Sequence, residues 1–103
     1  MFARDVIAYQ NTLSKTLANV EIRKQLIRSA GSVGANYIEA NESFSKKDFA
    51  LRLKICRKEA KESRYWLGLL EVNDDTIEKK KQTLIQEATE PLRIFNAIIE
   101  KQK

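Results

Sequence analysis

Two glutamates, Glu59 and Glu62, have the spacing best suited to metal binding or acid–base chemistry, because residues three apart share one face of a helix. Ferritin-like bundles hold two metal ions with Glu-x-x-His pairs on facing helices. The 103-residue sequence contains no histidine, so this pair lacks half of that motif and the commonest general base is missing as well. We therefore predict no metal site and no cofactor.

A lone cysteine and a pair of glycines are the next candidates. Cys56 has no neighbouring base to activate its thiol, so we interpret it as a small packing residue. Gly31 and Gly34 faintly resemble a phosphate loop but lack its Gly-Lys-Ser/Thr ending. In a helix each glycine costs about 1 kcal/mol relative to alanine, and we expect close contact with a neighbouring helix to be the reason for both. No catalytic residue is predicted, and an enzyme would have to assemble its site across subunits.

The basic residues are more regularly organised. The formal net charge is +5, and Lys79, Lys80 and Lys81 form a further basic run. One side of the third predicted helix carries six basic side chains: Lys47, Lys54, Arg57, Lys58, Lys61 and Arg64. This side is either a solvated face or an electrostatic platform for the phosphates of RNA or DNA. Aromatic residues do not alternate with it, apart from Tyr65 at its edge, so the pattern does not support sequence-specific RNA recognition.

Four helices are needed to position these residues, and apolar spacing predicts them at 3–17, 21–43, 45–71 and 75–101. The sequence contains only 3 Gly and 1 Pro. The third helix has a full heptad seam, made of Phe49, Leu53, Cys56, Ala60, Ser63, Leu67 and Leu70. Because the connections are short, we predict an all-α, antiparallel up-and-down four-helix bundle, formed by a single domain over residues 1–103.

Caps and a proline set the predicted ends of these helices. Ser45 is expected to cap the third helix, with Asp48 three positions on, and Asp75 the fourth. Pro91 lies inside the fourth helix and is expected to kink it or divide it. The first helix is expected to continue to residue 17 because apolar residues recur on one face: Phe2, Val6, Tyr9, Leu13 and Leu17.

The third helix also carries a second apolar face, formed by Leu51, Ile55, Trp66 and Leu69. One helix of a bundle normally buries a single stripe. The second face therefore either meets another neighbour in the same bundle or forms a subunit interface, where tryptophan and tyrosine are enriched.

A polar row on the second helix is expected to face the glutamates of the third. Its members recur at steps of four, four and three: Arg28, Ser32, Asn36 and Glu39. Counting back from the turn near Phe44 puts Arg28 level with Glu59 and Glu62 in an antiparallel pair. We predict a partly buried ionic network between them, which fixes register more than it stabilises. A solvated row and a ligand site are the alternatives.

The sequence also bears on where the protein works. It contains no apolar run near the roughly 20 residues that cross a bilayer, and its first residues lack the apolar core of a signal peptide. A single cysteine excludes an internal disulfide and fits a reducing compartment. We expect a cytoplasmic protein with no membrane partner.

Residues 25–40, QLIRSAGSVGANYIEA, resemble the signature of the 23S rRNA-intervening sequence proteins, a bacterial family of small four-helix bundles. Residues 45–49 (SKKDF), 58–63 (KEAKES) and 65–67 (YWL) resemble its second half. The resemblance implies a bundle that assembles into a ring, commonly a pentamer. It also implies kinship with the accessory variability protein of diversity-generating retroelements, a basic ring that binds nucleic acid and a reverse transcriptase.

Two functions remain open on this evidence. The leading hypothesis is a non-catalytic, self-assembling protein whose basic face contacts RNA or DNA without sequence specificity. The alternative is a scaffold that recognises another protein and is basic only for solubility. The first predicts nucleic-acid binding that weakens steeply with salt, and the second predicts none.

Overall fold

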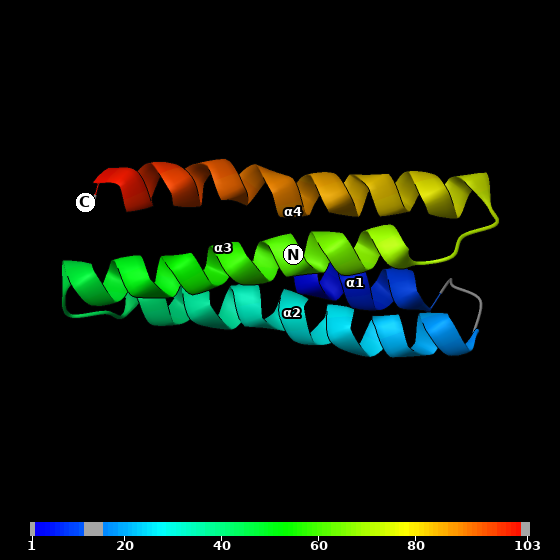
Figure 1. Ribbon diagram of the computed structural model, residues 1–103, viewed down its shortest axis with the longest axis horizontal. Coiled ribbons are helices and arrows are strands. Elements are labelled where there is room, and N and C mark those ends of the chain that lie inside the picture. Colours follow the sequence, from blue (N-terminus) through cyan, green and yellow to red (C-terminus); the bar gives the residue numbers. More distant parts are fainter. Residues whose placement is uncertain (1, 12–15, 102–103) are drawn as a thin grey trace.

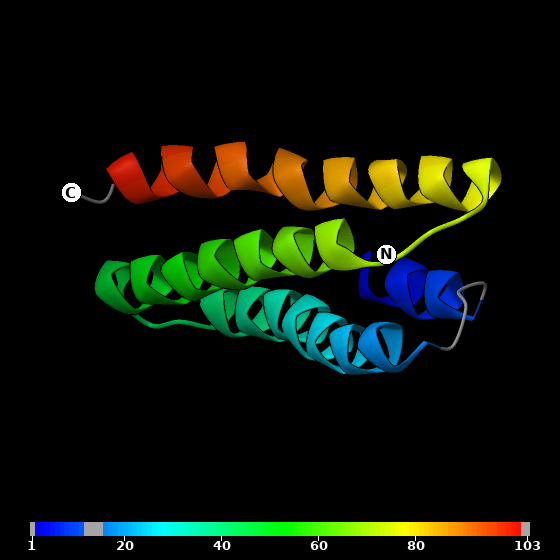
Figure 2. The ribbon, with the colours of Figure 1, turned by 45° about the vertical axis from the view of Figure 1, so that its right-hand side comes forward.

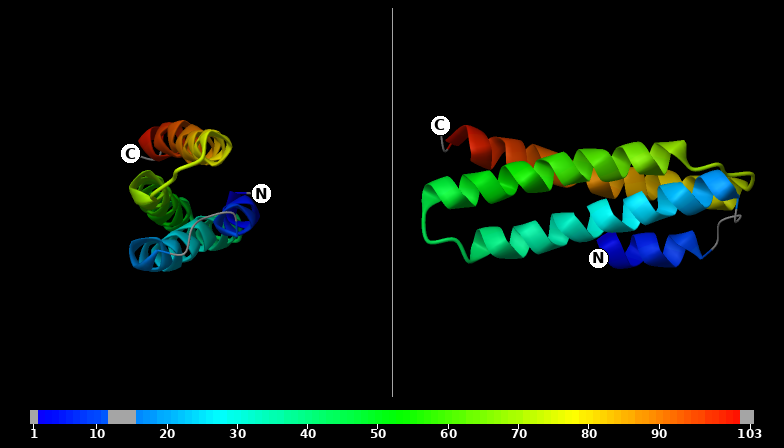
Figure 3. Two further views of the ribbon diagram at one scale, coloured as in Figure 1. Left: turned by 90° about the vertical axis from the view of Figure 1, so that its right-hand side faces the viewer. Right: turned by 60° about the horizontal axis from the view of Figure 1, so that its bottom comes forward.

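The computed structural model describes residues 2–11 and 16–101, which form α1 (Phe2–Gln10), α2 (Leu17–Asn41), α3 (Lys46–Leu69) and α4 (Asp75–Lys101). α2 and α3 make a long hairpin and α4 lies along α3, while the short α1 packs against α2 and α4 (Figures 1 and 2). Viewed along the bundle, the helices occupy four corners (Figure 3). The particle measures 46 × 20 × 19 Å. The predicted all-α, up-and-down antiparallel bundle is confirmed.

The boundary between the first two helices differs from the prediction. α1 ends at Gln10, and Leu17 opens α2 with 81% of its surface exposed, so the expected continuation of α1 is wrong. The Thr16 hydroxyl accepts a hydrogen bond from the Asn19 N–H at 3.0 Å, which caps α2. The cap pairs a backbone N–H of the first helical turn that would otherwise have no partner. Apolar spacing alone does not show where such a cap begins a helix. Leu13 lies outside the described residues.

The other helix ends show one confirmed cap and one correction. Ser45 caps α3, since its hydroxyl accepts from the Asp48 N–H at 3.1 Å. At α4 the Asp74 carboxylate accepts from the Ile77 N–H at 3.0 Å, so Asp74 occupies the capping position expected for Asp75. α4 is not divided at Pro91. A stripe of buried residues continues on both sides of the proline, and this packing offsets the roughly 3 kcal/mol that proline costs inside a helix.

Two apolar clusters form the core. One joins α1 to the neighbouring parts of the other helices through Val6, Tyr9, Leu26, Ala30, Leu67, Leu70 and Leu84. The other lies toward the α2–α3 turn and contains Ala40, Leu53, Cys56, Phe95 and Ile99. The heptad seam predicted for the third helix supplies residues to both clusters, so that prediction is confirmed, with Phe49 only partly buried. None of the helices within the described ranges is long and apolar enough to cross a membrane.

The glycines of α2 do not lie where we expected. Gly31 and Gly34 are exposed, and a Cβ added at either would meet nothing within 4 Å beyond the adjoining backbone of its own helix. Close packing inside the bundle therefore does not account for them. The helix-to-helix contact is made instead by Ser29, whose hydroxyl lies 2.8 Å from that of Ser63 in the buried α2–α3 contact.

Candidate functional site

Arg28 of α2 links to both glutamates on α3. Its guanidinium donates to the Glu59 carboxylate at 3.3 Å and to the Glu62 carboxylate, and also to Gln25 on its own helix at 3.2 Å. The Glu59 side chain is only 9% exposed, against 48% for Arg28. The Trp66 indole donates to Glu62 at 3.2 Å, which fixes that carboxylate from a second side.

The rest of the polar row divides into two parts. Asn36 donates to the backbone oxygen and the hydroxyl of Ser32 at 2.9 and 3.0 Å, and its own oxygen accepts from Arg52 of α3 at 3.2 Å. Arg52 is a partner that sequence spacing did not identify. Glu39 is exposed and makes no side-chain bond to this row. Arg28 and Asn36 of the row therefore cross-link α2 to α3, and Glu59 and Glu62 are the acceptors of the Arg28 guanidinium.

This geometry also decides how the Glu-x-x-Glu pair can act. Both carboxylates point at one guanidinium, which already supplies the positive charge that a metal ion would bring. Within residues 2–11 and 16–101, no group of three or more cysteine and acidic side chains is placed to hold a metal ion. Burial raises the pKa of the Cys56 thiol, whose sulfur lies 3.5 Å from the Val33 carbonyl oxygen, so the reactive thiolate is disfavoured.

The six basic residues of α3 separate into two classes. The guanidinium of Arg57 donates to Asn96 at 2.9 Å, and that of Arg64 donates to Thr89 at 3.4 Å, so both cross-link α3 to α4. Four lysines are exposed and form no ion pair with any part of the chain that the structure describes: Lys47, Lys54, Lys58 and Lys61. Of these six basic residues, the four lysines therefore have free ammonium groups, whereas the two arginines are engaged with α4.

The second apolar face of α3 is divided in the same way. Trp66 is partly buried and packs against the core cluster around α1, and its ring lies edge-on to that of Tyr65 at 5.2 Å. Ile55 is also partly buried, whereas Leu51 and Leu69 are exposed. One half of the face therefore packs within the bundle, and the other half is left open.

Two of the buried polar residues that were not identified from the sequence lie at the end of α3. Asn19 is fully buried, and its amide both donates to the Glu71 carbonyl at 3.1 Å and accepts from the Glu71 N–H at 3.0 Å. Lys81 was grouped with the basic surface, but its ammonium is buried against the Leu70 carbonyl oxygen at 3.2 Å. Both side chains bond to backbone groups that follow the last turn of α3, where carbonyl groups have no helical hydrogen-bond partner.

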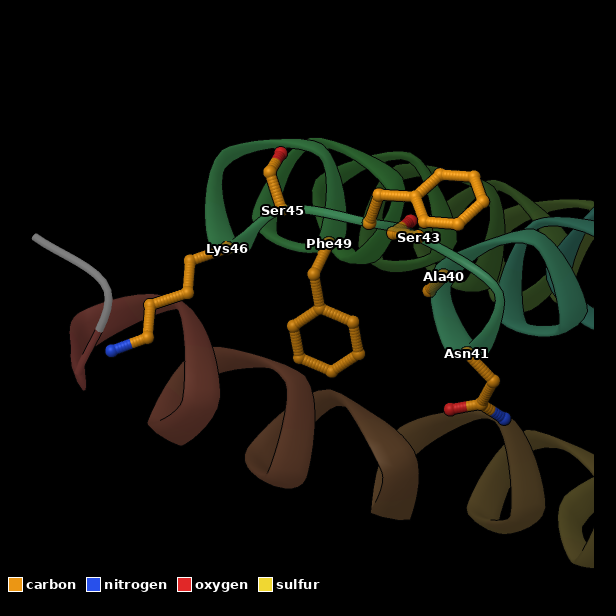
Figure 4. A pocket seen from close by; sticks show the side chains of 7 residues that line it. Ala40, Asn41, Ser43, Ser45, Lys46 and Phe49 are labelled. Atoms are coloured by element: carbon orange, nitrogen blue, oxygen red, sulfur yellow. The ribbon is translucent and has the colours of Figure 1, made fainter.

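A hollow of about 330 Å³ lies at the α2–α3 turn (Figure 4). Its lining contains one charged side chain, Lys46, and no carboxylate. Phe49 and Asn41 point from the hairpin toward α4 (Figure 4). This lining offers no pair of groups that could exchange a proton with a ligand.

A sequence model of the 23S rRNA-intervening sequence protein family matches residues 1–97. The chain belongs to this family. The family motifs quoted above fall on α2 and α3, which form the polar network and carry the α3 lysines. No curated protein shows significant similarity to the chain.

A solved structure supports the same assignment. The chain is 32% identical to a protein from Bacteroides thetaiotaomicron that is described as having unknown function and belonging to the S23 ribosomal protein family. The match covers 95% of this chain and 91% of that one, with a TM-score of 0.81. Similarity over nearly the full length of both chains places the family fold on α1 to α4 together.

Proposed function

We propose that this chain is a non-catalytic protein that assembles into a closed oligomer and binds RNA or DNA without sequence specificity through the lysines of α3. The observation that carries the proposal is the row of exposed lysines without ion pairs, Lys47, Lys54, Lys58 and Lys61. Ammonium groups that have no carboxylate partner can neutralise phosphates and release the counterions condensed on them, which drives non-specific binding. The lysine row lies on α3, which packs against both α2 and α4.

Self-assembly is supported by the open half of the second α3 face. Leu51 and Leu69 are exposed on this face and Tyr65 is exposed beside it; the buried core of an interface is more apolar than the rest of the surface, and tyrosine is enriched there. The family resemblance implies a ring of five subunits, and we include that number in the proposal. Repeating the lysine row in each subunit of a ring would raise affinity for a long nucleic acid without any new contact.

Two triple variants with the same charge change test the binding surface. Lys47→Gln/Lys54→Gln/Lys61→Gln removes three lysines from the α3 row, and Lys79→Gln/Lys80→Gln/Lys101→Gln removes three exposed lysines of α4. Each lowers the formal net charge from +5 to +2. Binding to mixed RNA and DNA pools is measured by fluorescence anisotropy over a salt series.

The α3 variant should bind RNA and DNA alike more weakly and should lose roughly 0.7–0.9 from the salt slope for each phosphate contact removed. The α4 variant should keep most of the wild-type slope. If both variants lose the same amount, net charge alone governs binding and the α3 row is not the interface. If the wild type shows no salt-sensitive binding at all, the nucleic-acid function is wrong.

One observation favours the second function, a protein-interaction scaffold. Phe44 is fully exposed at the α2–α3 turn, at the far end of the bundle from α1. An exposed aromatic side chain on a turn can anchor a protein partner. An oligomer that ignores nucleic acid at every salt concentration would favour this function, and Phe44 would then be the first position to mutate.

A further inference from the structure

A hollow of about 390 Å³ opens between α1 and α4, where α1 begins about halfway along the bundle (Figure 1). Both helices supply its lining: Phe2, Asp5, Glu87, Glu90, Pro91 and Ile94. Of these side chains three are apolar, three are acidic and none is basic. A concave, largely apolar surface with a few convergent polar groups is the usual form of a binding site. On a chain with a formal net charge of +5, an acidic hollow of this kind is an exception.

The two glutamates of the hollow have no cation. Within residues 2–11 and 16–101, neither Glu87 nor Glu90 forms an ion pair, and Glu90 accepts only from Gln86 of its own helix, at 3.3 Å. Asp5 lies in the first turn of α1, where an acidic side chain offsets the positive end of the helix dipole. The acidic acceptors left for a ligand are therefore Glu87 and Glu90.

Pro91 adds a third acceptor to the same wall. Proline has no backbone N–H, so the Glu87 carbonyl oxygen lacks the donor that the residue four positions later supplies in a helix. Glu87 and Pro91 both line the hollow, which places this oxygen at its surface. A proline inside a helix also lowers its stability, and a carbonyl group kept open to a ligand accounts for that cost.

We propose that this hollow, which we call the α1–α4 groove, binds a basic segment of another protein. A lysine or arginine of that segment donates to the two glutamates and to the Glu87 carbonyl oxygen, and such charge-assisted hydrogen bonds are short and strong. An apolar residue beside it covers Phe2, Pro91 and Ile94, of which Ile94 is 61% exposed. The charge and the apolar surface of the groove together select a partner that is both cationic and apolar.

The α1–α4 groove is separate from the proposed nucleic-acid surface. α1 packs against α2 and α4, whereas the exposed lysines stand on α3, the helix diagonal to α1 (Figure 3). Those lysines repel a basic segment, and the glutamates of the groove repel phosphates. One copy of the chain can therefore hold a nucleic acid and a basic protein segment at the same time, and the two sites are tested independently.

Two double variants with the same charge change test the groove. Glu87→Gln/Glu90→Gln neutralises its glutamates, and Glu39→Gln/Glu42→Gln neutralises two exposed glutamates near the α2–α3 turn. Each raises the formal net charge from +5 to +7. The probe is a fluorescein-labelled peptide that repeats Lys-Leu-Leu-Lys, and its binding to nuclease-treated protein is measured by fluorescence anisotropy. An unlabelled Lys-Ser-Ser-Lys peptide of equal length and spermidine serve as competitors that supply charge without leucine.

Wild type should bind the Lys-Leu-Leu-Lys peptide, and Glu87→Gln/Glu90→Gln should weaken that binding about tenfold, the scale of two partly exposed ion pairs. Glu39→Gln/Glu42→Gln should bind the peptide like wild type. If wild type binds no peptide, or if both variants lose the same affinity, the groove is not a site for a basic segment. If spermidine or the Lys-Ser-Ser-Lys peptide competes as well as unlabelled Lys-Leu-Leu-Lys, charge alone is recognised and the proposed partner is wrong.

Pro91→Ala separates recognition from folding. The substituted alanine supplies the missing N–H to the Glu87 carbonyl oxygen, so the melting temperature should rise while the affinity for the peptide falls about threefold or more. Circular dichroism follows the melting, and the same anisotropy assay gives the affinity. A stabilised variant that binds the peptide as tightly as wild type would remove the carbonyl group from the site and contradict this reason for the proline.

Discussion

Arg28→Ala would leave two carboxylates on α3 without their cation. Glu59 is the more affected, because its side chain is 9% exposed and accepts from Arg28 at 3.3 Å. Removing one partner of a fully buried pair costs roughly 3–5 kcal/mol, and an exposed pair contributes about 0–1 kcal/mol. The 48% exposure of Arg28 places this network between those limits, at about 2 kcal/mol of unfolding free energy.

That loss should lower the melting temperature by about 8–16 °C, because 1 kcal/mol corresponds to roughly 4–8 °C in a domain of this size. Urea unfolding followed by circular dichroism gives the free energy directly. All variants are compared at one protein concentration, since assembly adds stability that depends on concentration. Lys54→Ala is the control, because it removes one exposed positive charge from a helix without breaking an ion pair; it should change stability by less than about 0.5 kcal/mol.

A double variant separates the stranded charge from lost packing. Arg28→Ala/Glu59→Ala should be more stable than the sum of the two single losses predicts, because it leaves no buried carboxylate unpaired. The reasoning fails if Arg28→Ala costs no more than Lys54→Ala. In that case the network would be a solvated row with no part in holding α2 against α3.

Two further predictions concern the buried residues Asn19 and Tyr9. Asn19→Ala should lower the free energy of unfolding by about 3 kcal/mol, because the Glu71 carbonyl and N–H both lose the side-chain amide that pairs them. A decrease below about 1 kcal/mol in thermal unfolding would show that water replaces the amide. Burial and the nearby Glu78 raise the pKa of Tyr9 to about 12, whereas the unfolded chain releases this proton near 10. Unfolding free energy should therefore fall between pH 10 and 12, by up to roughly 2 kcal/mol from this residue. Tyr9→Phe should remove that part of the pH dependence, and parallel curves for the two proteins in urea titrations would contradict it.

Much of the bundle could be read from local patterns. The buried heptad seam of α3 and the Ser45 cap depend on residues within one or two turns of each other, so spacing and side-chain chemistry were enough to predict both. The register of α2 against α3 followed from counting back from one short turn, and Arg28 does meet Glu59 and Glu62. The prediction for α1 failed at Leu17 because apolar spacing continues through a break that the Thr16 cap determines.

By itself, the sequence determined the helices, the stripe that each one buries and the surplus of positive charge, since these depend on residue type and helical period. Apart from the Arg28 network, only the tertiary structure decided which polar groups are paired. It buried Lys81 and Asn19 at the end of α3, engaged Arg57 and Arg64 with α4, and left the α3 lysines free. It also left the glycines of α2 uncovered, where their spacing had predicted close packing. Pairing and exposure depend on neighbours distant in sequence, which no local period specifies.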